Sequence, residues 1–306
     1  MRVGVIGLGS MGMGAAVTLL RKPGLEVTGL DPRAAAREAF IAEGGAAVAR
    51  AAELPAGQQA VLVLVVNAAQ AREALFGPDA AADRLAPGGV CIVSSTMAPA
   101  DARLLAAEAA ARGLLYLDAP VSGGAAAAAA GAMTVMASGS EAAFAAARPV
   151  LQAIGKRIFD MGRGPGLGST MKVVHQLLAG VHIAAAAEAM ALGLKAGIEA
   201  QSLYDVVVGA AGNSWMFQNR MQHVLDGDDT PASAVDIFIK DLGLVTDLAR
   251  AESLPVPLAA QAQQLFVAAR GLGQGAKDDA FVIRVWEALA GITLPGSAAG
   301  PPPGST

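Results

Sequence analysis

The sequence has 306 residues, a formal net charge of −4 and 54% hydrophobic residues, which is enough chain for two domains of ordinary size. The slightly acidic balance argues against a nucleic-acid partner, because such proteins carry clustered Lys and Arg. The single cysteine, Cys91, excludes an internal disulfide, and we expect it to be a core thiol in a reducing, cytoplasmic setting.

In the first half of the chain, short apolar runs alternate with helical patterns, which is typical of parallel βαβ units. The run 61–66 is apolar without alternation, as in a strand that is covered on both faces. The expected strands are residues 3–6, 26–30, 61–66, 90–94, 114–117, 133–137 and 157–160, and the expected crossover helices are 99–112 and 141–154.

The pattern changes after the glycine-rich segment 162–168, because no convincing strand follows it. The most apolar long stretch, 173–198, contains Glu188 and Lys195, so it indicates a buried helix rather than a membrane span. The expected helices of this half are 169–196, 201–209, 215–225, 235–251, 258–269 and 279–290, with Trp215 and Phe217 in the core.

We therefore predict an α/β fold with two domains. A Rossmann-like dinucleotide-binding domain is expected at 1–164 and an all-helical domain at 165–294, joined by a long interdomain helix. The Pro- and Gly-rich tail at 295–306 is expected to be disordered, because it has too little apolar surface to bury.

A glycine-rich turn directly follows the first expected strand and opens a helical pattern. Gly7 permits the tight turn, Gly9 lets the backbone approach a pyrophosphate, and Gly12 allows close helix–strand packing. The whole turn comprises Gly7, Leu8, Gly9, Ser10, Met11 and Gly12. A purely structural turn is the alternative, but the strand–turn–helix context predicts a dinucleotide site.

Polar residues at three other strand ends extend this prediction. Asp31 follows the second expected strand, where a carboxylate accepts from the adenine ribose 2′-hydroxyl and repels a 2′-phosphate. This favours NAD over NADP, although Arg33 nearby would tolerate the phosphate; Asp31 as an N-cap for the helix near Ala34 is a compatible alternative. Asn67 and Thr96 are expected to line the cofactor groove, with loop capping as the alternative.

Four landmarks occur in order along the chain: the glycine-rich turn, then 118–124 (DAPVSGG), 166–172 (GLGSTMK) and 240–242 (KDL). Through them the chain, from about residue 2 to residue 294, resembles the β-hydroxyacid dehydrogenase family, which includes 3-hydroxyisobutyrate dehydrogenases. The resemblance implies a Rossmann-like domain joined by a long helix to an all-helical domain. Segments 65–70, 172–183 and 210–217 are similar to the L-threonate dehydrogenase group, and His175 stands where most members have Asn.

The resemblance implies that Lys172 is the catalytic residue, between the two domains. Oxidation of an alcohol requires loss of a hydride and of a proton, and Lys172 accepts that proton only if its pKa falls from about 10.4 toward neutrality. Otherwise a charged Lys172 stabilises the forming alkoxide. The resemblance places Lys240 beside the nicotinamide, with a surface salt bridge as the alternative.

Three further groups are expected to bind the substrate. The Ser122-Gly123-Gly124 turn offers backbone amides and a hydroxyl that suit a carboxylate, unless it is only a tight turn. His175 lies on the same helical face as Lys172 and either bonds a substrate hydroxyl or orients the lysine, the alternative being a satisfied core histidine. Asn213 offers a donor and an acceptor to a polyhydroxylated acid.

The resemblance to the L-threonate dehydrogenase group implies NAD-dependent oxidation of L-threonate at C2 to 2-oxo-3,4-dihydroxybutanoate. The alternatives are another short hydroxy acid (tartronate semialdehyde, 3-hydroxyisobutyrate or D-glycerate), an imine substrate, or a non-catalytic dinucleotide-binding protein. No metal site is expected, because His175 and His182 are about 10 Å apart along a helix without a carboxylate cluster. The apolar helical half predicts a homodimer or homotetramer.

Overall fold

The computed structural model describes residues 1–295 and divides the chain into two compact units, Met1–Val173 and Val174–Thr306. The tail predicted at 295–306 lies, from residue 296 onward, outside the described residues.

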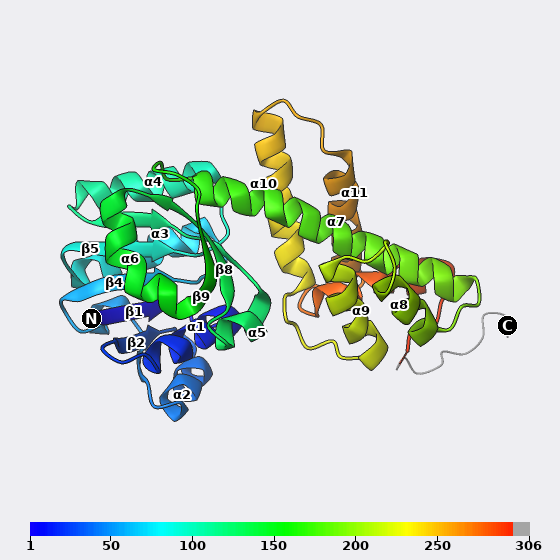
Figure 1. Cartoon of the computed structure of the whole chain (residues 1–306), viewed down its shortest axis with the longest axis horizontal. Helices are drawn as coiled ribbons and strands as arrows, with labels where there is room; N and C mark the ends of the chain where they lie inside the picture. The colour runs from blue at the N-terminus through cyan, green and yellow to red at the C-terminus, as the bar shows by residue number, and fades with distance from the viewer. Residues whose placement is uncertain (296–306) are drawn as a thin grey trace. The chain divides into compact units, whose positions relative to one another are not determined.

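The N-terminal unit contains a nine-stranded sheet with helices on both faces (Figure 1). Its strand order is β3-β2-β1-β4-β5-β6-β8-β7, with β9 beside β8. The first six strands of this order run parallel, whereas β8 is antiparallel to both β6 and β7. The strands are β1 Arg2–Ile6, β2 Glu26–Leu30, β3 Ala46–Val48, β4 Gln58–Val63, β5 Leu85–Val93, β6 Leu115–Asp118, β7 Val121–Ser122, β8 Met133–Gly139 and β9 Gly155–Asp160.

Each face of this sheet has its own apolar core, because successive residues of a strand point to opposite faces. Val5, Leu62 and Ile92 belong to the core that contains residues of α1, α5 and α6. Val63 and Cys91 belong to the other core, which contains residues of α3 and α4. The helices of the unit are α1 Ser10–Leu20, α2 Ala34–Ala42, α3 Ala68–Phe76, α4 Pro99–Ala111, α5 Gly124–Ala129 and α6 Glu141–Ile154, with short 3-10 turns η1 Ala51–Glu53 and η2 Ala81–Arg84.

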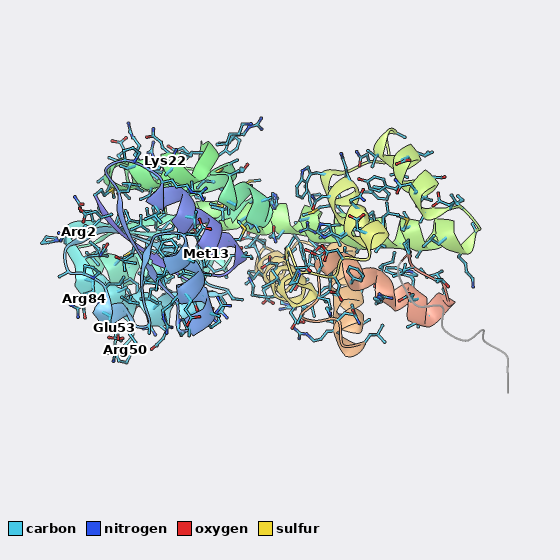
Figure 2. The ribbon with its side chains drawn as sticks, turned by 90° about the horizontal axis from the view of Figure 1, so that it is seen from below. Arg2, Met13, Lys22, Arg50, Glu53 and Arg84 are labelled. Carbon is cyan, nitrogen blue, oxygen red and sulfur yellow. The ribbon has the colours of Figure 1, made fainter. Side chains whose placement is uncertain are left out.

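The two edges of the parallel strands differ in their chemistry. At the amino ends of β1 and β2, Arg2 (Figure 2) pairs with Glu26 at 3.2 Å. At the carboxyl ends, the strand order reverses between β1 and β4, which is where open parallel sheets bind ligands. The glycine-rich turn after β1 lies at this second edge.

The C-terminal unit is helical. Helix α7, Leu167–Lys195, begins in the N-terminal unit and continues into this one. Helices α10 and α11 lie side by side (Figure 1), with the Phe238 and Phe266 rings stacked at 5.2 Å. The remaining elements are α8 Ala200–Val208, α9 Trp215–Asp226, α10 Val235–Ala251, α11 Pro257–Gly271, η3 Asp279–Ile283 and α12 Arg284–Ala290.

Helix α7 is the one helix of the described residues that is long and apolar enough to cross a membrane. Half of its most apolar window is buried inside the chain, where Ile183, Ala187 and Met190 are inaccessible or nearly so. The prediction of a buried helix therefore holds for only part of α7.

The predicted fold class is confirmed, and several boundaries need correction. Strand β4 ends at Val63 rather than Val66, which is 48% exposed, because the chain turns there into α3. The helix predicted at 279–290 begins with a 3-10 turn, since the Asp278 side chain accepts from the Ala280 N–H and tightens it. Phe217 is buried as expected, but Trp215, at the first position of α9, is 60% exposed.

Candidate active site

The glycine-rich turn has the shape that a phosphate cradle requires. Gly7 has φ +90°, and a Cβ there would lie 2.6 Å from the Leu64 carbonyl oxygen, so only glycine fits. A Cβ on Gly12 would lie 1.7 Å from the Gly7 carbonyl oxygen, which shows how closely α1 meets the turn. A Cβ on Gly9 would meet nothing within 4 Å, and Gly9 begins α1 without a side-chain cap. The amides of Ser10 and Met11 therefore belong to an uncapped helix N-terminus, which suits an anion.

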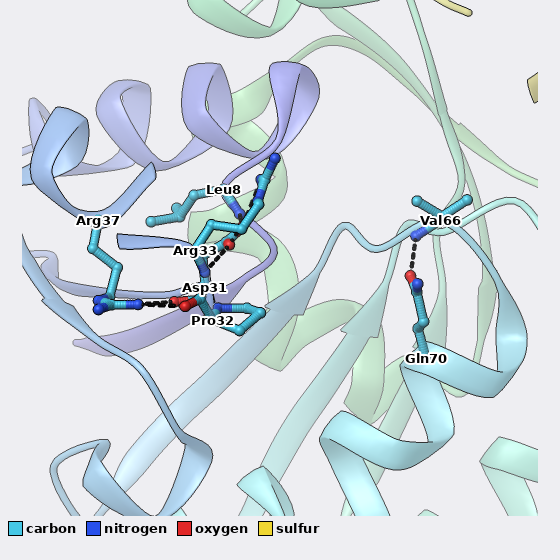
Figure 3. Close-up of polar contacts among 7 residues, drawn as sticks. All are labelled: Leu8, Asp31, Pro32, Arg33, Arg37, Val66 and Gln70. Carbon is cyan, nitrogen blue, oxygen red and sulfur yellow. Dashed lines mark hydrogen bonds and ion pairs between the residues drawn. The ribbon is translucent and has the colours of Figure 1, made fainter. Parts of the chain in front are cut away.

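Asp31 is buried directly below this turn (Figure 3). Its Oδ2 accepts from the Leu8 N–H at 2.9 Å and from Arg33 Nη2 at 2.9 Å. Its Oδ1 accepts from the Arg33 N–H and from Arg33 Nε, both at 2.9 Å. These bonds from Arg33, followed by that from Leu8, hold the pKa of Asp31 below its usual value despite the burial.

This arrangement has a consequence for ribose binding. A carboxylate offers about four lone-pair sites, and Leu8 and Arg33 already donate to both oxygens. The Arg33 side chain is 65% exposed, so it is the donor that a ribose hydroxyl can displace. The N-cap position before α2 is taken by Arg33, which corrects the alternative that assigned this role to Asp31.

Asn67 and Thr96 follow β4 and β5, as predicted from the strand ends. The Asn67 side chain caps α3, because its Oδ1 accepts from the Gln70 N–H at 2.9 Å. Gln70 in turn accepts from the Val66 N–H at 2.9 Å (Figure 3). Thr96 is half-buried, just beyond Ser95, whose hydroxyl accepts from the Val65 N–H. Loop capping, the alternative expected for Asn67, is thus present.

Ser122, Gly123 and Gly124 join a strand to a helix rather than forming an isolated turn. Ser122 ends β7, paired with Thr134 of β8, and Gly124 begins α5. Gly123 has φ +128° and Gly124 has φ +70°, which favour glycine at both positions. A Cβ on Gly124 would meet nothing within 4 Å, so a ligand can approach this stretch of backbone closely.

Asp118 anchors the start of α7 within the N-terminal unit. Its carboxylate is buried and accepts from the Gly166 N–H at 3.0 Å, the Ser169 N–H at 2.8 Å and the Ser169 hydroxyl at 2.7 Å. The Ser138 hydroxyl adds a longer contact at 3.3 Å. Burial raises the pKa of Asp118, and these hydrogen bonds oppose that rise. Asp118 therefore fixes the backbone that leads to Lys172.

Lys172 lies in the second turn of α7 and is only 7% exposed. Lysine is seldom buried to this degree, because its ammonium loses hydration. Such a lysine calls for a functional explanation more strongly than the solvated lysine that usually stands near a helix start.

The C-terminal unit holds a connected polar group. His175 Nδ1 lies 2.9 Å from Gln176 Oε1, and Gln176 Nε2 donates to Asp241 Oδ2 at 2.5 Å. Lys240 Nζ donates to Asp241 Oδ1 at 2.5 Å. Asp241 and Gln176 are buried, whereas Lys240 and His175 are half-buried. The salt bridge expected as an alternative for Lys240 exists, but with a buried partner.

Asn213 lies in the turn before α9. Its Nδ2 donates to the Val208 carbonyl at 3.2 Å, and the next residue, Ser214, caps α9 through the Phe217 N–H at 3.0 Å. The Asn213 Oδ1 is buried and has no hydrogen-bond partner among the described residues. The side chain thus holds the turn and retains an acceptor.

Comparison with known proteins follows the same division of the chain. Residues 2–162 match the model for the NAD-binding domain of 6-phosphogluconate dehydrogenase. Residues 166–286 match the model described as NAD-binding of NADP-dependent 3-hydroxyisobutyrate dehydrogenase. The chain is 54% identical over 296 residues to an L-threonate dehydrogenase of Escherichia coli O6:H1, covering 96% of this chain and 97% of that one. The chain belongs to the β-hydroxyacid dehydrogenase family.

Other β-hydroxyacid dehydrogenases agree with this membership. An L-threonate dehydrogenase of Cupriavidus necator is 51% identical over 97% of this chain and 98% of its own length. The crystal structure of 3-hydroxyisobutyrate dehydrogenase from Salmonella typhimurium superposes with a TM-score of 0.89 at 55% identity, covering 93% of this chain and 99% of that one. The protein is thus an NAD-dependent hydroxyacid dehydrogenase with a small-molecule substrate.

Sequence reasoning passed over three residues of this β-hydroxyacid dehydrogenase. Asp118 and Asp241 stand inside two of the family landmarks, yet no role was assigned to either. Gln176 stands next to His175 in an apolar helix, and a buried amide there was the available signal. The partners that these side chains find are distant in sequence, so spacing alone did not reveal them.

Proposed function

We propose that this protein oxidises L-threonate at C2, with NAD, to 2-oxo-3,4-dihydroxybutanoate. The main support for this substrate is sequence identity: the chain is 51–54% identical to five proteins named L-threonate dehydrogenase, over 96–97% of its length. His175 in a polar network supports it, since a hydroxylated acid needs polar partners.

The residues around the glycine-rich turn fit the cofactor. The open position at Gly9 and the N-terminus of α1, including Ser10 and Met11, would hold a pyrophosphate. Asp31 would bind the adenine ribose and favour NAD, while Asn67, Thr96 and Lys240 would contact the rest of the molecule. NAD, when bound, supplies the acceptor for the hydride that leaves C2.

The chain's own groups would perform the remaining steps. The Ser122 hydroxyl and the backbone amides of Gly123 and Gly124 bind the substrate carboxylate. Lys172 receives the proton of the C2 hydroxyl or, if it stays charged, stabilises the developing alkoxide. The carbonyl forms as the C2–H bond breaks, and the released proton passes to solvent. His175 and Asn213 bind the other hydroxyls.

A substrate panel tests this proposal. NADH formation is measured at 340 nm with L-threonate, D-threonate, D-erythronate, D-glycerate and 3-hydroxyisobutyrate. We expect the highest kcat/KM with L-threonate. A preference for D-glycerate or 3-hydroxyisobutyrate would agree with a hydroxyacid dehydrogenase but would contradict the assignment of L-threonate as its substrate.

Lys172→Ala tests the catalytic assignment. We expect kcat to fall by orders of magnitude, about 10²-fold or more as for a lost general acid–base group, with NAD binding preserved. Lys22→Ala, at an exposed lysine of the same unit (Figure 2), is the matched control and should be neutral. Near-normal kcat in Lys172→Ala would remove this residue from the mechanism.

We also propose that the protein is cytoplasmic and forms a homo-oligomer. The single buried Cys91 is compatible with a reducing cytoplasm. Exposed apolar side chains on the helices of the C-terminal unit, including Leu192, Val206 and Leu258, favour a homodimer or homotetramer. Light scattering coupled to gel filtration measures the mass directly, and a monomer at micromolar concentration would contradict the assembly.

A further inference from the structure

The polar network of the C-terminal unit has a defined direction. Asp241 receives Lys240 Nζ on Oδ1 and Gln176 Nε2 on Oδ2, each at 2.5 Å. An ionised carboxylate accepts and does not donate, so Gln176 must present its amide nitrogen to Asp241. The other end of the Gln176 amide, Oε1, then faces His175 Nδ1 at 2.9 Å.

This direction determines which nitrogen of His175 carries hydrogen. Oε1 of Gln176 is an acceptor, so the hydrogen bond forms only if Nδ1 is the protonated nitrogen. In a neutral imidazole the lone pair then resides on Nε2. We propose that Gln176 and Asp241 are positioning residues that hold His175 in its Nδ1–H tautomer, so that Nε2 accepts a hydrogen bond from a substrate hydroxyl.

The proposal rests on the proposed function for the identity of the hydroxyl donor. His175 follows Lys172 by three residues on α7, so both side chains leave the same face of that helix. A Lys172 that removes or stabilises one hydroxyl and a His175 that accepts from a neighbouring hydroxyl suit a 2,3-dihydroxy acid. A hydroxy acid without the second hydroxyl would not form this bond to His175.

The neutral amide between the ring and the carboxylate has its own effect. A carboxylate directly on Nδ1 would favour the charged imidazolium, which has no acceptor. Asp241 instead fixes the orientation of the Gln176 amide, and that amide fixes which ring nitrogen is protonated. No negative charge then lies against the ring. The buried positions of Gln176 and Asp241 keep water from replacing either bond.

Nitrogen NMR of the full-length protein with ¹⁵N-labelled histidine tests the tautomer without turnover. The signals of His175 are assigned by their loss in His175→Asn. At a pH where the ring is neutral, we expect a protonated Nδ1 and an unprotonated Nε2. A wild-type His175 in the Nε2–H form would overturn the proposal.

Two variants test the origin of the tautomer. Gln176→Leu removes the acceptor, and Asp241→Asn lets the Gln176 amide turn over, so both should shift His175 toward Nε2–H. Gln263→Leu is the matched control, because Gln263 donates to the Ile239 carbonyl at 3.2 Å and is not part of this network. If Gln176→Leu does not fold, the tautomer of His175 in Asp241→Asn is the test. An unchanged Nδ1–H tautomer in a folded variant would overturn the proposal.

Kinetics separate a positioning role from a structural one. In Gln176→Leu, kcat/KM for L-threonate should fall about tenfold to hundredfold, as for a buried hydrogen-bonding group left unmatched. The value for 2-hydroxybutanoate, which has no C3 hydroxyl, should change far less, and the KM for NAD should stay the same. Equal losses on both acids would overturn the hydroxyl role. A wild type that has the Nδ1–H tautomer but does not oxidise L-threonate would refute the proposed function and leave the tautomer assignment intact.

Discussion

The Ser169 hydroxyl donates to Asp118 Oδ1 at 2.7 Å, while the Ser169 N–H donates to Asp118 Oδ2 at 2.8 Å. One buried carboxylate at the end of β6 therefore holds both the side chain and the backbone of a residue in the first turn of α7. Lys172 comes one turn later on the same helix. The position of the proposed catalytic lysine is thus tied to the carboxyl edge of the parallel sheet.

Asp118→Asn should disturb this connection with little change in volume. Its amide nitrogen would face an N–H or O–H donor, so at least one buried donor would lose its acceptor, at a cost of about 1–3 kcal/mol. We expect a lower free energy of unfolding by urea and a lower kcat. Asp83→Asn, at an exposed position of η2, should leave both unchanged. Full activity in Asp118→Asn would show that Lys172 is positioned by other contacts.

Asp31→Asn tests cofactor selection. The uncharged amide no longer repels a 2′-phosphate, so the ratio of kcat/KM for NAD to that for NADP should fall, by about tenfold for each 1.4 kcal/mol of lost discrimination. Arg33→Ala removes the guanidinium that pairs with Asp31 and should keep the NAD preference. A preference for NADP in the wild type would refute the role assigned to Asp31.

Cys91 should be unreactive in the folded protein. It is fully buried in β5, and burial raises the pKa of its thiol to about 12. Only the thiolate attacks alkylating reagents, and almost none exists near pH 8 at such a pKa. Iodoacetamide should label it only after urea unfolds the chain. Rapid labelling under native conditions would contradict its burial.

The buried pair of Arg220 and Asp279 should stabilise the C-terminal unit. Arg220 Nε donates to Asp279 Oδ1 at 2.5 Å, and the Asp279 carboxylate is inaccessible. Asp279→Ala would leave the buried guanidinium with neither of its acceptor oxygens and should cost about 3–5 kcal/mol of unfolding free energy. Asp247→Ala breaks the exposed pair with Arg250 and should cost less than about 1 kcal/mol. Equal costs would show that burial is irrelevant here.

The titration of Asp279 gives the stability a pH dependence of defined sign, which is measured against the neutral variant Asp279→Asn. Burial raises the pKa of Asp279 to about 6, although Arg220 opposes the rise. The folded chain therefore holds this proton more tightly than the unfolded chain, whose pKa is near 3.8. Between these values, the stability of the wild type relative to Asp279→Asn should fall as the pH rises. An opposite slope in urea titrations would show that Arg220 outweighs burial.

The sequence predicted the architecture well because local patterns determine it. Helices α6 and α10 have the predicted bounds, since Ser140 caps the first and an apolar stripe marks the second. Strand β7 escaped prediction because its two residues form a strand only through pairing with β8. The turn at Gly7 was predictable because its φ of +90° favours glycine locally, although the Leu64 carbonyl that also excludes a Cβ there is distant in sequence.

The candidate site was less predictable where its contacts are distant in sequence. Asp118 and Ser169 are 51 residues apart, and Gln176 and Asp241 are 65 apart. Nothing in the spacing of these residues indicates their pairing. The contact of Asn67, by contrast, was predictable from the sequence. Its side chain caps α3 through Gln70, three residues away, and capping was the stated alternative for this residue.

The measurement that tests the central claim most directly is the fate of the hydrogen on C2. The wild-type protein is supplied with NAD and L-threonate that carries deuterium only at C2, and the NADH formed is analysed by mass spectrometry. Oxidation at C2 predicts NADH that contains one deuterium and a primary isotope effect on the chemical step. Unlabelled NADH would place the oxidation at another carbon, and no NADH would contradict the substrate.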